Sequence, residues 1–307
     1  MPDVPAMVIV KLDTGEGGDG GEGGGDDVLV ALKERSAEVL ERAFAFLERE
    51  AGRRELDRAR VLMGVDPADA WVEGIAAGQT EAGALPEQGV FAGGGTGPDD
   101  LAGQAPPPSL AGTFESLLVL SDAGALGRPC VERAGLYLMG QQNDDGSFGE
   151  ADTPAPMRLF LTGMIAGLLG QTTHVRPDLL HDAGDWLAPR FSPEAVEGGN
   201  WPAITAYGTF FSNVGHERSD EALQWCGREL ERGFRTRAFD AVSTARVLLH
   251  CDASGLPGAR FEPGELVVAL LTEQQIDGSW PTAEHSGAGD PVERTLDALL
   301  ALLRLAP

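Results

Sequence analysis

Acidic side chains gather in one short run of the sequence, and clustered carboxylates are a candidate for metal chemistry. The run is Asn143-Asp144-Asp145-Gly146-Ser147-Phe148-Gly149-Glu150, and Asp and Glu oxygens are the ligands that divalent cations prefer. The same run is typical of a tight turn, because Asp-Gly supplies the backbone conformation that such a turn needs. We favour the turn, and we predict neither a metal site nor a cofactor.

The thiols and imidazoles of this chain are scattered. Cys130, Cys226 and Cys251 form no Cys-x-x-Cys motif, and no histidine stands at ligand spacing from them. We therefore expect small buried thiols instead of disulfides or a zinc site, and a reducing cytoplasmic location. The histidines show no pairing suited to nucleophilic catalysis; they are His174, His181, His216, His250 and His285.

Charge excludes one class of partner. The chain has 307 residues and a formal net charge of −25, from 48 acidic and 23 basic residues. Nucleic-acid binding needs clustered Lys and Arg, so we expect no nucleic-acid partner. No segment reaches the roughly 20 apolar residues of a membrane span. Peripheral membrane contact through a local apolar patch stays open, and so does the oligomeric state.

The chain divides by composition into a tail and one domain. Residues 1–27 are acidic and glycine-rich without apolar periodicity, so we expect this segment to be disordered. Residues 28–307 are predicted to form a single domain. Within it, residues 78–109 are rich in Gly, Pro and Ala, which predicts a long loop.

The elements of the domain are predicted to be helices. Apolar residues recur at helical spacing, and no β pattern occurs, which indicates an all-α fold. The expected helices cover residues 27–52, 53–63, 113–126, 130–142, 156–170, 177–187, 204–214, 219–233, 241–251, 262–275 and 291–305.

Two of these helices end in similar turns. The segments Gln142-x-x-x-Gly146-x-Phe148 and Gln274-x-x-x-Gly278-x-Trp280 share a Gln-Gln pair, an Asp-Gly-Ser turn and a closing aromatic residue. We expect the aromatic ring to fold back on the preceding helix, and the Gln side chain to satisfy open backbone groups at helix ends. Degraded copies are predicted at residues 197–202 and near Phe239. The chain therefore contains a repeat.

The two complete segments resemble the QW motif of squalene-hopene cyclases and related terpenoid cyclases, and protein prenyltransferase β subunits have a looser version. The resemblance covers about Gly112 to Pro307. It implies an α/α barrel, or toroid, of paired inner and outer helices, with fewer than six full pairs. It also implies an isoprenoid substrate in a central cavity.

In squalene-hopene cyclases an Asp-x-Asp-Asp-Thr-Ala motif supplies the acid that protonates an alkene. The matching stretch is Asp240-Ala241-Val242-Ser243-Thr244-Ala245, in which Val242 replaces the proton-donating Asp and Ser243 the next one. The candidate acid is therefore Asp240, helped by Glu115 or Glu293 from neighbouring inner helices. The other interpretation is that Asp240 caps the helix that follows.

The zinc chemistry of prenyltransferases is not expected. Their β subunits use an Asp and a Cys two residues apart, and a His before a Thr on the last inner helix. Val242 stands in place of that Cys, and Arg294 precedes Thr295 where the His would be.

Aromatic residues on the predicted inner helices are the candidate substrate-binding groups. They are Phe160, Trp201, Tyr207, Phe210 and Phe211. Such rings could shield an isoprenoid and stabilise cations, at about 1–2 kcal/mol each, or they could fill the core. We expect a terpenoid cyclase-like protein that acts by proton-initiated cyclisation if it is active. The alternative is a catalytically silent barrel that binds an apolar small molecule or a protein partner.

Overall fold

The computed structural model describes residues 24–90, 109–173, 175–282 and 290–306, and the regular secondary structure in these ranges is helical. The helices are α1 (Gly24–Glu50), α2 (Arg53–Leu62), α3 (Ala68–Ala77), α4 (Leu110–Asp122), α5 (Pro129–Met139), α6 (Ala155–Gly170), α7 (Pro177–Leu187), η1 (Ala188–Arg190), α8 (Pro193–Val196), α9 (Trp201–Asn213), α10 (Ser219–Thr236), α11 (Ala241–His250), α12 (Pro263–Glu273) and α13 (Pro291–Leu305). The all-α prediction is confirmed.

Some bounds differ from the sequence prediction. Helix α1 begins at Gly24, so residues 24–27 do not belong to the predicted disordered tail; acidic residues there suit a helix N-terminus. Helix α3 occupies a stretch for which we predicted no helix. Residues 1–23 and 91–108 lie outside the described residues, and the predictions of a tail and of most of the long loop fall on them.

Proline marks the start of many of these helices. It occupies the first or second helical position, where its missing N–H costs nothing and its fixed φ angle suits the helix. The residues are Pro129, Pro156, Pro177, Pro193, Pro202, Pro263 and Pro291.

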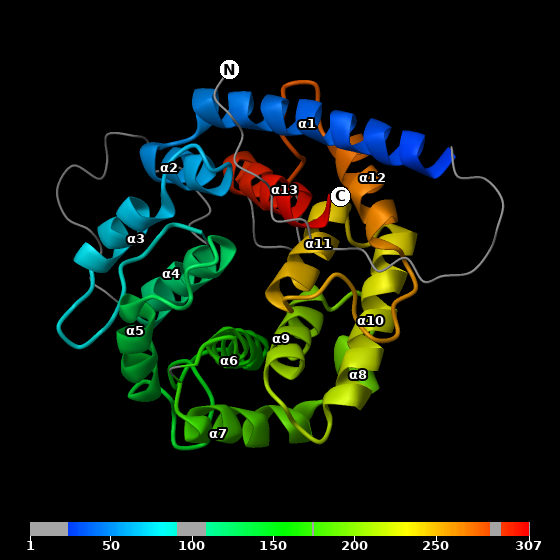
Figure 1. Ribbon diagram of the computed structural model, residues 1–307. Coiled ribbons are helices and arrows are strands. Elements are labelled where there is room, and N and C mark those ends of the chain that lie inside the picture. Colours follow the sequence, from blue (N-terminus) through cyan, green and yellow to red (C-terminus); the bar gives the residue numbers. More distant parts are fainter. Residues whose placement is uncertain (1–23, 91–108, 174, 283–289, 307) are drawn as a thin grey trace.

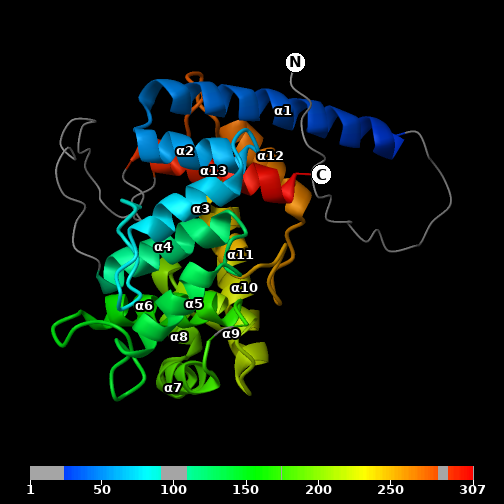
Figure 2. The ribbon, with the colours of Figure 1, turned by 60° about the vertical axis from the view of Figure 1, so that its left-hand side comes forward.

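The helices lie in two layers (Figure 1). Helices α1, α3, α5, α7, α10 and α12 lie toward the outside, and α4, α6, α9, α11 and α13 lie nearer the middle. Burial agrees with this arrangement, because Ala203–Phe211 of α9 is buried on every side, whereas α10 buries one face. Figure 2 shows the same molecule from the side, with α1 at one end and α7 at the other.

Small residues bring α6 and α9 into direct contact. A Cβ atom on Gly163 would lie 2.5 Å from the carbonyl oxygen of Ala206, and one on Gly167 would lie 2.7 Å from Cγ2 of Thr209. Larger side chains at these glycines would push the two helices apart, since such distances are far inside van der Waals contact.

The turn after α5 fastens that helix to α7. The Nε2 atom of Gln142 donates to the carbonyl oxygens of Gly146 (2.9 Å) and of Leu179 in α7 (3.0 Å). Gly146 has a φ of 86°, and a Cβ atom on it would lie 2.1 Å from the carbonyl oxygen of Asp182. We call this arrangement of one Gln and one Gly a clasp.

The turn after α12 forms a second clasp, which contacts α1. The Nε2 atom of Gln274 donates to the carbonyl oxygens of Gly278 (3.0 Å) and of Val39 (2.9 Å). A Cβ atom on Gly278, where φ is 98°, would lie 2.2 Å from the carbonyl oxygen of Arg42. The ring of Trp280 folds back as predicted, and its Nε1 donates to Leu270 of α12. The second clasp therefore joins α12 to the first helix.

A third clasp lies where we predicted only loop. The Nε2 atom of Gln79 donates to the carbonyl oxygens of Gly83 (2.7 Å) and of Cys130 in α5 (2.8 Å), which joins α3 to α5. Residues 78–90 form no helix or strand, as the loop prediction requires, but the sequence analysis missed the clasp within them, because Leu85 stands where the other copies have an aromatic residue.

Each clasp also contacts the following helix of the inner layer. The backbone N–H of the closing residue donates to a threonine hydroxyl on that helix, and the threonines lie on α4, α6 and α13 respectively. The pairs are Leu85 with Thr113 (3.0 Å), Phe148 with Thr162 (2.9 Å) and Trp280 with Thr295 (3.4 Å).

The two predicted degraded copies lack the Gln contact. Trp201 does not close a turn on the preceding helix; it is the first residue of α9, and its Nε1 donates to the carbonyl oxygen of Ser243 in α11 (3.1 Å). Phe239 does fold back on α10, because a Cβ atom on Gly233 would lie 2.1 Å from its ring.

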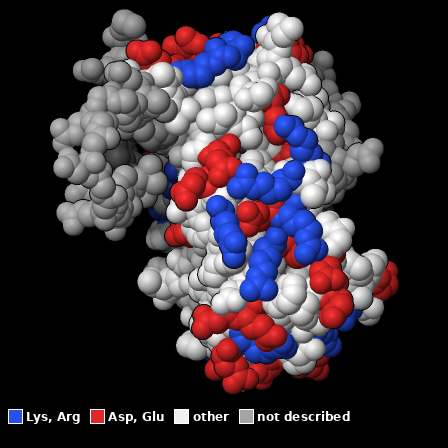
Figure 3. Space-filling view, turned by 90° about the vertical axis from the view of Figure 1, so that its right-hand side faces the viewer, with Lys and Arg blue, Asp and Glu red and all other residues white. Residues whose placement is uncertain are grey.

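One face of the molecule shows how its surface charges are arranged (Figure 3). It is the side at which α10 and α12 lie in Figure 1, and it bears a band of basic side chains bordered by acidic ones. Arg235 pairs with Glu265 at 2.5 Å, and Arg232 pairs with Glu229 at 2.9 Å. Charges on this face are thus locally balanced, although the chain is strongly acidic.

The clasp geometry predicts that one added methyl group at Gly278 lowers the stability of the protein. Gly278→Ala should lower the free energy of unfolding by about 1–3 kcal/mol, because it adds a Cβ atom against a carbonyl oxygen at a positive φ. Gly264→Ala in α12 is the control, since nothing lies within 4 Å of its Cβ position. Urea unfolding measures both variants, and equal stabilities would contradict the clasp.

Candidate functional site

Asp240, the predicted acid, caps α11. Its Oδ1 accepts from the backbone N–H of Ser243 (2.7 Å), and the same carboxylate forms an ion pair with the buried Arg294. The nearby carboxylate of Glu273 accepts from the N–H of Ala241 (3.0 Å), and burial raises the pKa of Glu273. Sequence reasoning missed Glu273, because it lies on α12, more than 30 positions from Asp240.

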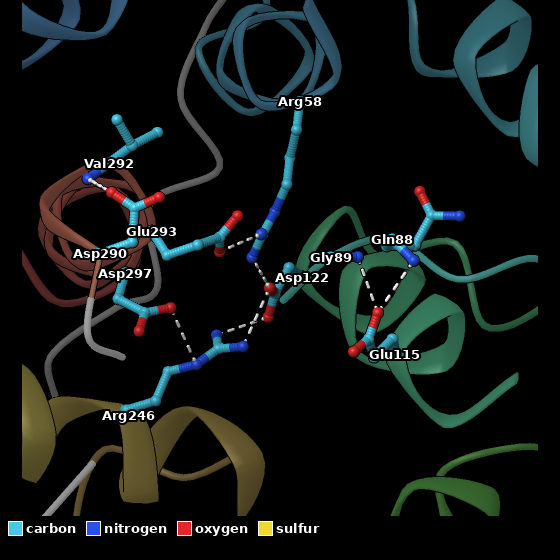
Figure 4. Close-up of polar contacts among 10 residues, drawn as sticks. All are labelled: Arg58, Gln88, Gly89, Glu115, Asp122, Arg246, Asp290, Val292, Glu293 and Asp297. Atoms are coloured by element: carbon cyan, nitrogen blue, oxygen red, sulfur yellow. Dashed lines mark hydrogen bonds and ion pairs between the residues drawn. The ribbon is translucent and has the colours of Figure 1, made fainter. Parts of the chain in front are cut away.

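Glu115 has a different position and partner. It is buried in α4, and its Oε2 accepts from the backbone N–H groups of Gln88 (2.9 Å) and Gly89 (2.7 Å). This carboxylate therefore fixes the segment that follows the clasp of Gln79 to α4. Figure 4 shows Glu115 and Glu293 on opposite sides of Asp122, each with its own partners.

An ion-pair network that includes Glu293 joins four helices (Figure 4). Arg58 of α2 donates to Asp122 of α4 (2.6 Å) and to Glu293 of α13 (3.0 Å). Arg246 of α11 donates to both oxygens of Asp122 (2.6 and 3.1 Å), and its Nε lies 3.2 Å from Asp297. We call these five residues the central network.

Burial and pairing act against each other in the central network. Burial opposes the charge on Asp122, but Arg246 and Arg58 outweigh it and lower the pKa of Asp122 to about 2. Burial raises the pKa of Glu293 to about 7; Arg58 opposes this shift, and Asp297 adds to it.

A neighbouring imidazole stays neutral. Burial, followed by the charge of Arg246, lowers the pKa of His250 to about 3. Its backbone carbonyl accepts from Gln171 (3.0 Å) and from Asn213 (3.0 Å). His250 thus takes part in helix packing through its backbone, and its ring adds no charge at neutral pH.

Two cavities of very different size lie beside the central network, and the larger, of about 700 Å³, has Asp122, Gln171 and Arg304 in its wall. A cavity lined by Arg58, Glu293, Trp71 and Val119 has a volume of about 10 Å³, which is room for about one water molecule. An isoprenoid chain does not fit into this smaller cavity.

The predicted substrate-binding aromatics pack mainly on one another. Tyr207 and Phe211 stack at 6.1 Å between ring centroids, and Phe210 meets Phe211 edge-on at 5.1 Å. A Cβ atom on Gly184 of α7 would lie 3.3 Å from Phe210, so this cluster lies between α9 and the outer layer. Phe160 is half-buried on α6 and meets Phe114 edge-on at 6.2 Å.

A cavity of about 580 Å³ lies where α6 and α9 begin, beside the end of α7. We call it the α6–α9 cavity. Its wall includes Leu159, Trp186 and Tyr207, together with the two arginines Arg158 and Arg190. Of the predicted substrate-binding residues, Tyr207 belongs to this wall.

The Tyr207 hydroxyl has no partner. The residue is fully buried, and no group in the described part of the chain forms a hydrogen bond with its oxygen. A buried hydroxyl without a partner is costly, at about 1–3 kcal/mol. Burial also raises the pKa of Tyr207, so the hydroxyl stays protonated and can donate.

Comparison with known proteins assigns no family. A scan against family models found no match, and searches of curated proteins and of solved structures found none either. Among the described residues, no helix is long and apolar enough to cross a membrane, and no His, Cys, Asp or Glu side chains form a group that could hold a metal ion. The three cysteines are buried, as predicted.

The raised pKa of Glu293 predicts how stability depends on pH. The folded protein binds this proton more tightly than the unfolded chain, whose glutamates titrate near 4.5, so the Glu293 contribution falls as pH rises from about 4.5 to 7. Glu293→Gln keeps an acceptor for Arg58 and removes the titration. The variant should therefore gain about 1–3 kcal/mol relative to the parent between pH 5 and pH 8. A constant difference in the free energy of unfolding between the variant and the parent from pH 5 to pH 8 would refute the raised pKa of Glu293.

The unpartnered hydroxyl of Tyr207 predicts that its removal stabilises the ligand-free protein. Tyr207→Phe should raise the free energy of unfolding by about 1 kcal/mol, because an unsatisfied buried oxygen is lost. Tyr137→Phe on the partly exposed face of α5 is the matched control and should change stability little. A clear loss of stability in Tyr207→Phe would mean that the hydroxyl has a partner.

Proposed function

We propose that these helices form a closed α/α barrel of six pairs. The pairs are α1 with α2, α3 with α4, α5 with α6, α7 with α9, α10 with α11, and α12 with α13. The clasps support this proposal, since they join α3 to α5, α5 to α7, and α12 to α1. Helix α13 also packs against α1 and α2. Helices α1–α3 supply the part of the barrel that the QW resemblance does not cover.

The proposed function of this barrel is to bind an apolar small molecule without converting it. The observation that carries the proposal is the central network, which places the charged side chains of Asp122, Arg58 and Arg246 between the helices instead of an apolar lining. Asp240 supports the same conclusion, because its carboxylate is engaged in capping α11 and in an ion pair with Arg294.

The proposed binding place is the α6–α9 cavity. Its volume of about 580 Å³ lies in the range of small-molecule sites, which are mostly apolar with a few polar groups. Leu159, Trp186 and Tyr207 supply apolar and aromatic surface in its wall. Proton-initiated cyclisation at Asp240 is the competing proposal.

Incubation with isoprenoids separates the two proposals. Purified protein incubated with squalene, farnesyl diphosphate or geranylgeranyl diphosphate should give no cyclised product in gas chromatography with mass spectrometry. Cyclised product that disappears in Asp240→Asn would overturn the binding proposal.

Binding itself is tested by filling the cavity. Calorimetric titration with dodecanol or dodecanoate should detect binding to the parent protein. Ala203→Leu adds volume to the cavity wall and should weaken that binding at least about 10-fold, since the extra methyl groups compete for the same space. Ala269→Leu on the partly buried face of α12 is the control. Failure of both probes to bind the parent would refute the proposed function.

A further inference from the structure

We propose that Asp145–Gly146 and Asp277–Gly278 are sites of isoaspartate formation, which are protected while their clasp is closed and react when it opens. This proposal concerns a covalent change of the protein itself and does not depend on what the barrel binds. A further Asp–Gly pair, Asp19–Gly20, lies outside the described residues.

The reaction is an attack of the main chain on the aspartate side chain. The backbone nitrogen of Gly278 bonds to Cγ of Asp277, the nitrogen gives up its proton, and a carboxyl oxygen leaves as water. Water then adds to the peptide carbon of Asp277 in the resulting succinimide and breaks its bond to the nitrogen. Gly278 stays attached through Cγ, so the main chain becomes one carbon longer, and no atom is gained or lost overall. Glycine favours ring formation, because it has no side chain and its backbone is the least restricted.

The closed clasp engages the attacking nitrogen. The N–H of Gly278 donates to the carbonyl oxygen of Gln275 (3.1 Å), and the N–H of Gly146 donates to that of Asn143 (2.8 Å). Each glycine also lies against the next outer helix, where a Cβ atom would meet the carbonyl oxygen of Arg42 or Asp182. Ring formation rotates the Asp–Gly peptide, which these contacts resist.

A serine engages the carboxylate in both clasps. Oδ1 of Asp277 accepts from the backbone N–H (3.0 Å) and the hydroxyl (2.7 Å) of Ser279. Oδ1 of Asp145 accepts from the same two groups of Ser147, at 3.1 and 2.6 Å. These bonds lower the pKa of both aspartates. The carboxylates therefore stay ionised, whereas the loss of water needs the neutral acid.

The two sites differ in one contact. Asp145 accepts a further hydrogen bond at Oδ2, from Nε1 of Trp186 (3.1 Å). We therefore expect Asp145 to react more slowly than Asp277. The clasp of Gln79 has Ala82 before its glycine, so it cannot form the succinimide.

An isoaspartate would keep a clasp from closing again. The added main-chain carbon displaces the glycine from a contact that has no room for even a Cβ atom. The modification at Asp277 would release α1, and the modification at Asp145 would release α7.

Ageing of the full chain at neutral pH tests the proposal. Peptide mapping by liquid chromatography and mass spectrometry follows each site, because the isomer elutes separately at unchanged mass. We expect the folded parent to react at both sites at least about 10-fold more slowly than the same chain unfolded in urea, since the folded chain reacts from its opened state. Equal rates in the folded and the unfolded chain would overturn the protection.

Serine variants connect the protection to the named hydrogen bonds. Ser279→Ala should accelerate the reaction at Asp277 about 10-fold, since a hydrogen bond to a charged group is lost, and leave Asp145 unchanged. Thr272→Ala is the matched control and should change neither rate, because the Thr272 hydroxyl donates within α12, to Val268 (2.7 Å).

A second variant opens the same clasp without removing a bond to the aspartate. Gln274→Ala removes the contact with Val39 of α1 and should also accelerate the reaction at Asp277 alone. Unchanged rates at Asp277 in both variants would overturn the proposal. Equal acceleration at Asp145 and Asp277 would show that global unfolding controls the reaction and would overturn the role of the individual clasp. Acceleration in Gln274→Ala but not in Ser279→Ala would overturn the role of the serine.

Discussion

A glutamine side chain that donates to two backbone carbonyls is the contact on which the rest of this structure depends. One carbonyl belongs to the glutamine's own turn, and the other to the next outer helix along the chain, as with Gln142 and Leu179. The glycine of the turn must stay bare, because its Cα lies against the backbone of that helix. Gln274 makes the same contacts to α1, so the repeat that orders neighbouring helices also joins the end of the chain to its beginning. This contact carries the proposal of a closed barrel.

Because the clasps hold the helices together, the polar side chains between these helices have little access to water. Asp122, Arg58 and Arg246 meet there, 5–7% exposed as side chains. A buried pair of this kind contributes little net stability, since desolvation offsets most of the attraction, but losing one partner is costly. The central network therefore joins α2, α4, α11 and α13 through charged side chains. Larger cavities lie at the ends of α4, α11 and α13, where Asp122 belongs to the wall, and at the starts of α6 and α9.

Local patterns in the sequence predicted much of the fold. Apolar periodicity predicted most of the helices, and two Gln-x-x-x-Gly-x-aromatic segments predicted two clasps. The clasp at Gln79 escaped because Leu85 replaces the aromatic residue, although the Gln and Gly spacing was present. The central network could not be predicted, since its paired members lie 51 to 235 positions apart and none belongs to a motif. Tyr207 was chosen for its place on an inner helix, but which aromatics reach a cavity depends on side-chain packing.

Hydrogen exchange tests the role of the clasps most directly, because it reports the protection of each helix separately. In Gln274→Ala, the amides of α1 around Val39 and Ala43 should exchange faster than in the parent, and those of α7 should change less. In Gln142→Ala the order should reverse, with α7 losing more protection than α1. This pattern follows if each glutamine holds the outer helix that it contacts. Equal acceleration in all helices of both variants, or unchanged exchange in α1 of Gln274→Ala, would contradict the account.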